Sequence, residues 1–183
     1  MPDRSQVQLV DEDGHSAGTM AKLAAHEAPG HLHLAFSVFL FDAAGRLLVQ
    51  RRASSKYHFP GMWANACCSH PEPGEELVAS AGRRLEEELG VTTDLRDVGT
   101  FVYRAVDPAS GRVEHELDHV LVGTLADGAL PEPAADEVEA VAWVEPGEVA
   151  GAGPERGYAP WFAEALEIAL AAEGSSGCEE RST

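Results

Sequence analysis

The chain has 183 residues, with 13 Lys or Arg against 31 Asp or Glu, and its formal net charge is −18. This length suggests one domain, and the acidic balance argues against nucleic acid as a partner, because phosphate backbones attract basic surfaces. Three cysteines fit a reducing compartment better than a disulfide framework. The sequence shows no signal peptide and no apolar run of about 20 residues that could span a membrane. We therefore expect a soluble, cytoplasmic protein without a membrane partner.

The N-terminal part of the chain is expected to form an arm and then a hairpin. Residues 1–21 are polar and lack periodicity, which predicts a mobile arm. Residues 31–41, HLHLAFSVFLF, are apolar and rich in aromatic and β-branched side chains, as in a buried strand. The turn DAAG separates this strand from a second one, RLLVQRR at 46–52, so the two are expected to pair.

A helix is predicted after a loop that contains Pro60 and Gly61. Residues 75–90, EELVASAGRRLEEELG, carry apolar side chains at helical spacing. Gly90 follows the last apolar position and can end the helix in a left-handed conformation.

Strands and one more helix complete the predicted fold. Residues 98–106 and 113–125 form two strands about the turn DPASG, and 137–146 form another. Residues 159–173 have the pattern of an amphipathic helix, and the polar residues 174–183 are expected to be a disordered tail. The sequence thus predicts a single α+β domain with a mixed sheet.

The few basic residues are grouped in the sequence. Arg51, Arg52 and Lys56 lie close together, and Arg83 is followed by Arg84. An acidic protein that concentrates its cations in this way is a candidate for binding a small anion. The alternative is that these cations only balance neighbouring carboxylates, which we favour for Arg83.

The predicted helix could hold a metal-bound diphosphate. Arg84 and Glu88 are four residues apart and share a face, with Glu87 beside them. Magnesium binds carboxylate oxygens together with substrate phosphates. Taken alone, however, this stretch is more typical of a solvated helix face with an internal ion pair.

The stretch NACCSH places two cysteines side by side. If it is extended, Cys68 and His70 point to one face and Cys67 to the other. One sulfur could then line a pocket while the other packs as a small hydrophobic group.

The side chains of the stretch VEHELDH should alternate between two faces in the same way. Glu114 and Glu116 share one face of a predicted strand, and burying them is costly unless a positive group lies nearby. With His26, His33 and His70 available, a divalent metal site is chemically reasonable. An edge strand with a solvated polar face is an equally good interpretation of the pattern.

A family resemblance joins these segments. The helix resembles the Nudix box, in which Gly, five residues, Glu and seven residues lead to Arg-Glu-x-x-Glu-Glu-x-Gly. At that spacing the chain has Glu75, Arg83, Glu87, Glu88 and Gly90. It departs from the box at Ser69, in place of the first Gly, and at Arg84, in place of a Glu.

Both departures resemble the type 1 isopentenyl diphosphate isomerase family. So do the segments HLAFSVFLF, RRASSK, FPGMWANACCSHP, YRAVDPASGRVEHE and APW. The resemblance spans residues 22–162, and it implies a Nudix-type isomerase domain at 22–173. It also implies interconversion of isopentenyl and dimethylallyl diphosphate by an allylic proton shift, within isoprenoid biosynthesis.

The resemblance implies a role for each matching residue. Cys68 would be the catalytic cysteine, Glu116 its partner in proton transfer and Tyr103 an assisting hydroxyl. Glu88 would bind Mg²⁺ that bridges to the diphosphate. The expected ligands of a further divalent metal, for which three imidazoles favour manganese, zinc or iron, are His26, His33, His70, Glu114 and Glu116. The expected substrate-binding residues are Lys22, Arg52, Lys56, Arg84 and Trp161.

Two alternatives stay open from the sequence. A Nudix diphosphate hydrolase would gather metals on several helix carboxylates to activate water, and Arg84 argues against it. A non-catalytic diphosphate-binding module would need neither Cys68 nor Glu116. In either case the partner is a small molecule, and we expect a monomer or a weak homodimer.

Overall fold

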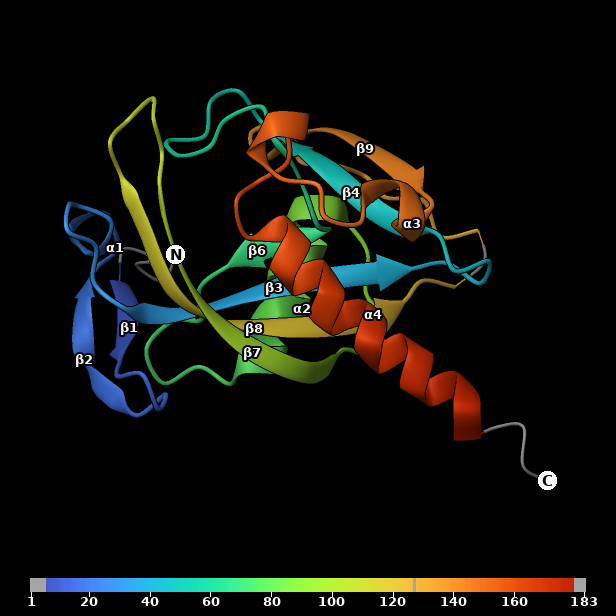
Figure 1. Cartoon of the computed structure of the whole chain (residues 1–183), viewed down its shortest axis with the longest axis horizontal. Coiled ribbons are helices and arrows are strands. Elements are labelled where there is room, and N and C mark those ends of the chain that lie inside the picture. Colours follow the sequence, from blue (N-terminus) through green and yellow to red (C-terminus); the bar gives the residue numbers. More distant parts are fainter. Residues whose placement is uncertain (1–5, 127, 180–183) are drawn as a thin grey trace.

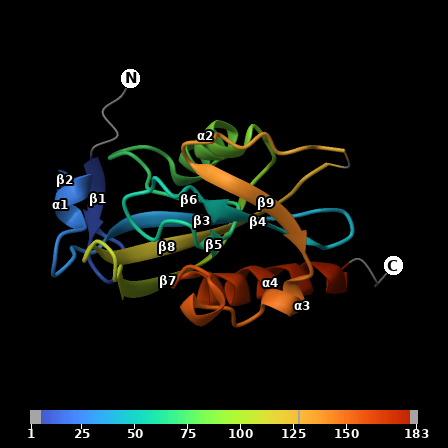
Figure 2. The same ribbon diagram turned by 90° about the horizontal axis from the view of Figure 1, so that it is seen from above.

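The computed structural model describes residues 6–126 and 128–179, which form one mixed β-sheet with helices on both faces (Figure 1). The view in Figure 2 shows α2 (Leu77–Leu89) above the sheet and α4 (Phe162–Glu179) below it. The predicted α+β fold, with a mixed sheet between helices in a single domain, is therefore confirmed.

Within the described residues, the sheet has nine strands, and three short helical segments accompany α2 and α4. The strands are β1 (Gln6–Val10), β2 (Ser16–Ala21), β3 (His33–Phe41), β4 (Leu47–Arg52), β5 (Trp63–Ala64), β6 (Cys67–Ser69), β7 (Arg96–Val106), β8 (Val113–Thr124) and β9 (Val138–Val144). The short helical segments are α1 (Lys22–Ala25), α3 (Pro146–Val149) and the 3₁₀ turn η1 (Pro154–Arg156).

Strand β3 lies at the centre of the sheet. It pairs with β8 in parallel and with β1, β4 and β6 antiparallel. The register with β8 sets His33 beside Glu116, and the β7–β8 register sets Tyr103 beside Glu116. The pairing with β6 sets Ser37 beside Cys68. Residues far apart in the sequence therefore meet at one end of β3.

The continuous apolar run of β3 reflects burial on both faces of the sheet. Phe36, Val38 and Leu40 belong to the core under α2. The alternate residues Phe39 and Phe41 belong to the core under α4. A strand covered on both sides needs no polar face, so this segment was recognisable from its composition.

The predicted N-terminal arm is corrected by the structure over residues 6–21. Strands β1 and β2 pair there as an antiparallel hairpin, and Leu9 of β1 lies beside His33 of β3. Most β2 side chains are exposed, which explains why the stretch looks polar and irregular in sequence. Residues 1–5 of the expected arm lie outside the described residues.

The C-terminal boundary also differs from the expectation. Helix α4 continues to Glu179, so residues 174–179 are helical where a disordered tail was expected. Residues 180–183 lie outside the described residues.

Helix α2 has defined ends that fix its position. At its start the Glu76 carboxylate accepts hydrogen bonds from the backbone N–H groups of Val78 and Ala79. At its end Gly90 adopts a φ of 66°, which Gly tolerates at no steric cost. The predicted helix at 75–90 is thus slightly shorter, at 77–89.

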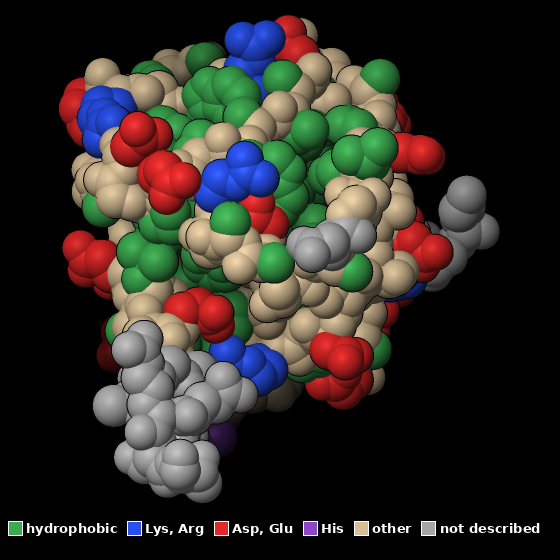
Figure 3. Space-filling view, turned by 90° about the vertical axis from the view of Figure 1, so that its right-hand side faces the viewer, with side chains coloured by type: hydrophobic (Ala, Val, Ile, Leu, Met, Phe, Trp, Pro, Cys, Tyr) green, Lys and Arg blue, Asp and Glu red, His purple; other side chains and the backbone are tan. Residues whose placement is uncertain are grey.

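Two surface features bear on possible partners. No helix within 6–126 and 128–179 is long and apolar enough to cross a membrane. On the face shown in Figure 3, acidic side chains are spread among hydrophobic ones, and the Lys and Arg side chains stand apart from one another. That face therefore offers no continuous basic surface.

Candidate active site

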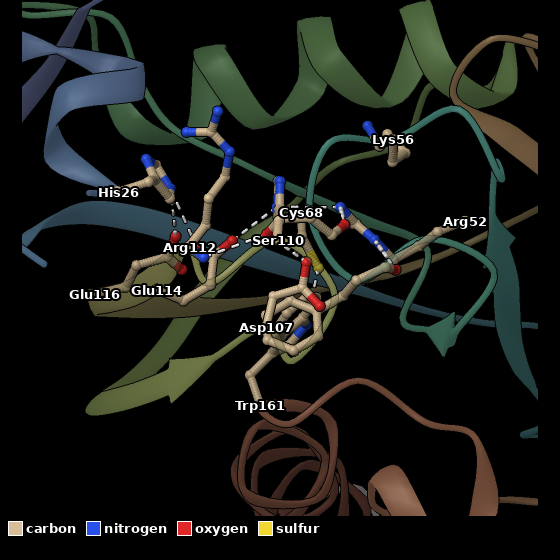
Figure 4. A network of polar contacts seen from close by, with 12 residues as sticks. His26, Arg52, Lys56, Cys68, Asp107, Ser110, Arg112, Glu114, Glu116 and Trp161 are labelled. Atoms are coloured by element: carbon tan, nitrogen blue, oxygen red, sulfur yellow. Dashed lines mark hydrogen bonds and ion pairs between the residues drawn. The ribbon is translucent and has the colours of Figure 1, made fainter. Parts of the chain in front are cut away.

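A cavity of ≈ 230 Å³ lies beside the first half of β3, where Ser37 lines it together with Cys68, Tyr103 and Glu116. Its walls come from the 52–58 loop, β6, α2, the β7–β8 pair and the residue before α4. Figure 4 shows Cys68 between Glu114 and Glu116 on one side and Arg52 and Lys56 on the other. Predicted site residues among those lining the cavity are Lys22, Arg52, Lys56, Cys68, His70, Arg84, Tyr103, Glu114, Glu116 and Trp161.

The five predicted metal ligands form one cluster. One ligand atom from each of the five lies within 4.8 Å of all the others. His26 follows α1, His33 begins β3, His70 follows β6, and both carboxylates come from β8. The five are His26, His33, His70, Glu114 and Glu116.

The histidine rings are oriented as metal ligands would be. The Nδ1 atoms of His26 and His33 lie 2.6 and 2.7 Å from the backbone oxygens of Lys22 and His31. A neutral ring that donates through Nδ1 keeps a lone pair on Nε2, and both Nε2 atoms are buried without a hydrogen-bond partner. They point to carboxylate oxygens, at 3.4 Å from Glu114 and from Glu116 respectively. Imidazole and carboxylate donors of this kind fit a divalent metal.

The structure decides between the two interpretations of the carboxylate strand. Strand β8 lies between β3 and β7 and is not an edge, and Glu114 and Glu116 are only 2% and 5% exposed. Burial alone would raise the pKa of Glu116, but hydrogen bonds with Glu114, His33 and Tyr103 hold it well below its usual range. These carboxylates are thus buried and charged, which needs nearby positive groups.

The two neighbouring cysteines face opposite sides of the sheet. Cys67 is fully buried in the core under α2, whereas Cys68 lines the cavity. Burial, followed by the charge of Asp118, raises the pKa of the Cys68 thiol to about 12. Cys68 therefore rests as a neutral thiol that carries a proton.

Tyr103 contacts Glu116, the carboxylate that His33 and His70 also face. Its hydroxyl donates a 2.6 Å hydrogen bond to Glu116 Oε2. Burial and the charge of Glu116 raise the pKa of Tyr103 well above its usual value. This hydroxyl keeps its proton and holds the carboxylate in one orientation.

The predicted anion-binding cations divide into two groups. Lys56 and Arg84 both contact Glu137, the latter at 3.3 Å, and both line the cavity. Arg51 and Arg83 instead pair with other carboxylates, Glu139 at 3.1 Å and Glu75 at 2.9 Å. The interpretation of Arg83 as a balancing charge agrees with this contact.

The helix face that carries Arg84 and Glu88 has the ion pair of one interpretation and the buried position that the other requires. Arg84 contacts Glu88 at 2.5 Å and Glu87 at 2.7 Å. Glu88 is only 2% exposed, however, and so is not on a solvated surface. This face of α2 points into the molecule beside the cavity.

The backbone of a neighbouring loop orients Arg52. Its guanidinium donates to the carbonyl oxygens of Phe59, at 3.1 Å, and His58, at 3.2 Å. Phe59 adopts a φ of 43°, which is unusual for a bulky residue. Arg52 also stacks on Trp161, with its guanidinium carbon 5.5 Å from the ring centroid.

Five further residues at the site escaped the sequence analysis. Tyr57 and His58 line the cavity, and His58 Nε2 lies 2.8 Å from Glu114 Oε1. Ser37 donates to Asp118 at 2.7 Å, and both are buried. Asn65 contacts Cys68 and Trp161. Ser37 and Asp118 lie within strands, and Tyr57, His58 and Asn65 lie in loops, so no common sequence pattern identifies the five.

The NUDIX domain profile matches residues 31–164. A protein of Nocardia farcinica called isopentenyl-diphosphate Delta-isomerase is 55% identical over 91% of this chain and 95% of its own length. Proteins of that name from Streptomyces griseus subsp. griseus and Halorhodospira halophila are 52% and 43% identical. They cover 89% and 93% of this chain, and 82% and 98% of their own lengths.

The chain belongs to the isopentenyl-diphosphate Delta-isomerase family of NUDIX-domain proteins.

Solved structures agree on the fold. DR0079 from Deinococcus radiodurans superposes with a TM-score of 0.67 at 20% identity, covering 88% of this chain and 97% of its own. A MutT protein from Methanosarcina mazei Go1 gives 0.61 at 18% identity, over 74% and 91%. At this identity the likeness concerns the fold alone. The resemblance inferred from the Nudix box is confirmed by the NUDIX domain match over residues 31–164.

Proposed function

We propose that this protein interconverts isopentenyl diphosphate and dimethylallyl diphosphate by an allylic proton shift. The observation that carries the proposal is the meeting of Cys68 and Glu116 in one cavity that also presents four cations. Its relatives, at 43–55% identity over most of the chain, are isopentenyl-diphosphate Delta-isomerases by name.

The basic side chains bind the diphosphate in this proposal. Arg52 is held rigid by the carbonyls of its loop, and Lys22 lines the same cavity. Lys56 and Arg84 meet at Glu137. A diphosphate offers oxygens to all four cations, and Glu88 would hold Mg²⁺ against the same group.

Two proton-carrying groups perform the chemistry. One of Cys68 and Glu116 delivers a proton to a terminal carbon of the alkene and creates a tertiary cation. The other removes a proton from the CH₂ carbon on the opposite side of the cationic carbon, so that the double bond moves and no atom is lost. Holding both groups around a bound substrate makes each transfer effectively intramolecular. Tyr103 orients Glu116 through its hydrogen bond.

The His/Glu cluster is proposed to hold one divalent metal through His26, His33, His70, Glu114 and Glu116. When bound, such an ion would stabilise the charged form of Glu116, so that this carboxylate would readily release any proton that it takes from the substrate. Three imidazoles favour manganese, zinc or iron over magnesium. The cluster also explains how two carboxylates can be buried together.

The walls of the cavity protect the cation from water. Trp161 is 3% exposed, and its ring face can stabilise a passing cation by about 1–2 kcal/mol. Phe59 packs edge-on against Trp161, with ring centroids 5.8 Å apart, and closes that side. Exclusion of water prevents capture of the cation as an alcohol.

The structure offers less support for a hydrolase. Arg84 pairs with Glu87 and Glu88, and its positive charge opposes the gathering of several metals on the helix, whereas a single Mg²⁺ bound together with the diphosphate needs only Glu88. A binding module without chemistry would have no use for a thiol and a charged carboxylate in one cavity. We therefore favour the isomerase over both alternatives.

Phosphorus NMR distinguishes these functions. Isopentenyl diphosphate is incubated with the protein, Mg²⁺ and Mn²⁺, and the phosphorus and proton signals are followed together. We expect dimethylallyl diphosphate to appear while both diphosphate signals remain. Release of phosphate or pyrophosphate would support the hydrolase, and an unchanged substrate would support the binding module.

A further inference from the structure

We propose that Asn65 is a positioning residue that holds the Cys68 thiol and the Trp161 indole in the relative positions that proton transfer needs. This inference rests on the proposed isomerase function. Asn65 lies between β5 and β6, three residues before Cys68, and its side chain is fully buried. It does not line the cavity, so it would act through its two neighbours.

The orientation of the Asn65 amide is fixed by its surroundings. Its nitrogen donates to the backbone oxygens of Val38, at 3.1 Å, and Cys67, at 2.8 Å. Its oxygen accepts from Cys68 Sγ at 3.0 Å and from Trp161 Nε1 at 3.1 Å. Only this orientation matches donors with acceptors, because a flipped amide would set its oxygen against two carbonyl oxygens and its nitrogen against the indole N–H.

The indole N–H is shared between the amide and the sulfur. Trp161 Nε1 lies 3.1 Å from Asn65 Oδ1 and 3.2 Å from Cys68 Sγ. The three groups therefore form a closed triangle of polar contacts beneath the cavity. In this triangle Asn65 is an acceptor, Trp161 is a donor and the thiol can be either.

The triangle suits both protonation states of the sulfur. As a thiol, Cys68 donates its S–H to Asn65 Oδ1. When the proton passes to the substrate carbon, the sulfur keeps the electron pair and becomes an acceptor. The Trp161 N–H is already in place to donate to the thiolate, while Asn65 Oδ1 loses the S–H and keeps the indole N–H as its donor. When Cys68 instead receives a proton, the same contacts operate in the reverse order.

The amide also connects the thiol to the scaffold. Its two donor bonds reach β3 and β6, and Trp161 immediately precedes α4. One buried amide, fixed to the sheet, therefore holds both the reacting sulfur of Cys68 and the indole of Trp161. Placement of this kind matters, because small displacements of reacting groups are costly in rate.

Asn65→Leu tests the proposal, because leucine has a similar size and no polar atoms. We expect kcat for isomerisation to fall about 10- to 100-fold, while KM changes by less than about threefold because the diphosphate contacts remain. The indole proton signal of Trp161, assigned with Trp161→Phe, should move in the nitrogen–proton NMR spectrum. Metal content should be unchanged.

Gln50→Leu is the matched control. Gln50 is a second buried amide, 2% exposed, whose Oε1 has no hydrogen-bond partner among the described residues, and it does not line the cavity. We expect this variant to keep kcat within about threefold and the indole signal in place. An equal loss of kcat in Gln50→Leu and Asn65→Leu would overturn the proposal.

The remaining outcomes are distinct. Full kcat in a folded Asn65→Leu protein, or an unmoved Trp161 indole signal, would overturn the positioning role. If Asn65→Leu does not fold, the Trp161 indole proton signal of the wild-type protein tests the proposal instead. A Trp161 indole proton that exchanges rapidly with solvent or resonates as a free indole would overturn the proposal, and a protected, hydrogen-bonded one would support it. A wild-type protein that does not isomerise the substrate would instead refute the proposed function.

Discussion

Exchanging the two neighbouring cysteines for alanine should separate chemistry from packing. Cys68→Ala removes the thiol from the cavity and leaves Asn65 and Trp161 with one contact fewer. Loss of a proton-transfer group should lower kcat at least ~100-fold, which is about 2.7 kcal/mol of transition-state stabilisation. The metal cluster does not include this sulfur, so the bound metal and the fold should remain.

Cys67→Ala should have the opposite profile. Its sulfur is fully buried in the core under α2, and deleting a group of about methylene size costs about 1 kcal/mol. In a chain of this size that loss lowers Tm by about 2–4 °C. The turnover rate should stay close to that of the wild type, because the side chain faces away from the cavity.

The assay follows isomerisation by proton NMR, and thermal unfolding of both variants is measured alongside. An inactive Cys67→Ala protein with an active Cys68→Ala protein would refute the assignment of faces. Full activity in both variants would show that neither sulfur takes part in the chemistry.

Further predictions concern the anion site, the metal and pH. Arg84→Ala should weaken an inert diphosphate analogue by about 1.5–3 kcal/mol in calorimetry, whereas Arg83→Ala, which loses an ion pair with Glu75, should weaken it far less. Equal affinities of Arg84→Ala and wild type would count against the assignment. The purified protein should hold one tightly bound divalent metal by elemental analysis, and its removal should lower Tm, since a ligand at 100 times its Kd stabilises the folded state by about 2.7 kcal/mol. His33→Leu should abolish that metal binding, and retention of a full equivalent of metal would contradict the cluster. Burial raises the pKa of Glu137, but Lys56 and Arg84 lower it below its usual value. The Glu137 charge therefore contributes its full share to the free energy of unfolding above about pH 4.3, the pKa of Glu in the unfolded chain. That contribution is lost as pH falls below this value. Glu137→Gln should flatten the decline of Tm between about pH 5 and pH 3, and an unchanged slope would show that this carboxylate is not the group concerned.

The elements with strong local signals were predictable from the sequence. Strand β3 is apolar throughout because both faces are covered, and α2 has helical spacing with Gly90 at its end. The hairpin β1–β2 was missed because most β2 side chains are exposed and carry no core pattern. The hairpin joins the rest of the sheet where Leu9 of β1 lies beside His33 of β3, a contact that no local pattern could show.

The candidate site was predictable only where residue types identify the chemistry. Cys68 and the two carboxylates of β8 could be placed on faces by strand alternation, and His26, His33 and His70 were candidate ligands by residue type. The family resemblance then assigned the three histidines and two carboxylates to one metal. Asn65 and Ser37 could not be found, because their roles arise from strand register and from the approach of Trp161 across the sheet. A buried amide or hydroxyl gives no sequence signal that distinguishes it from an ordinary loop residue.

Proton NMR of isopentenyl diphosphate incubated with the protein and divalent metal in deuterated water tests the central claim most directly. We expect dimethylallyl diphosphate to accumulate with deuterium incorporated from the solvent, because protons pass through exchangeable groups on Cys68 and Glu116. Wild-type protein with its metal bound that leaves isopentenyl diphosphate unchanged and free of deuterium would contradict the claim.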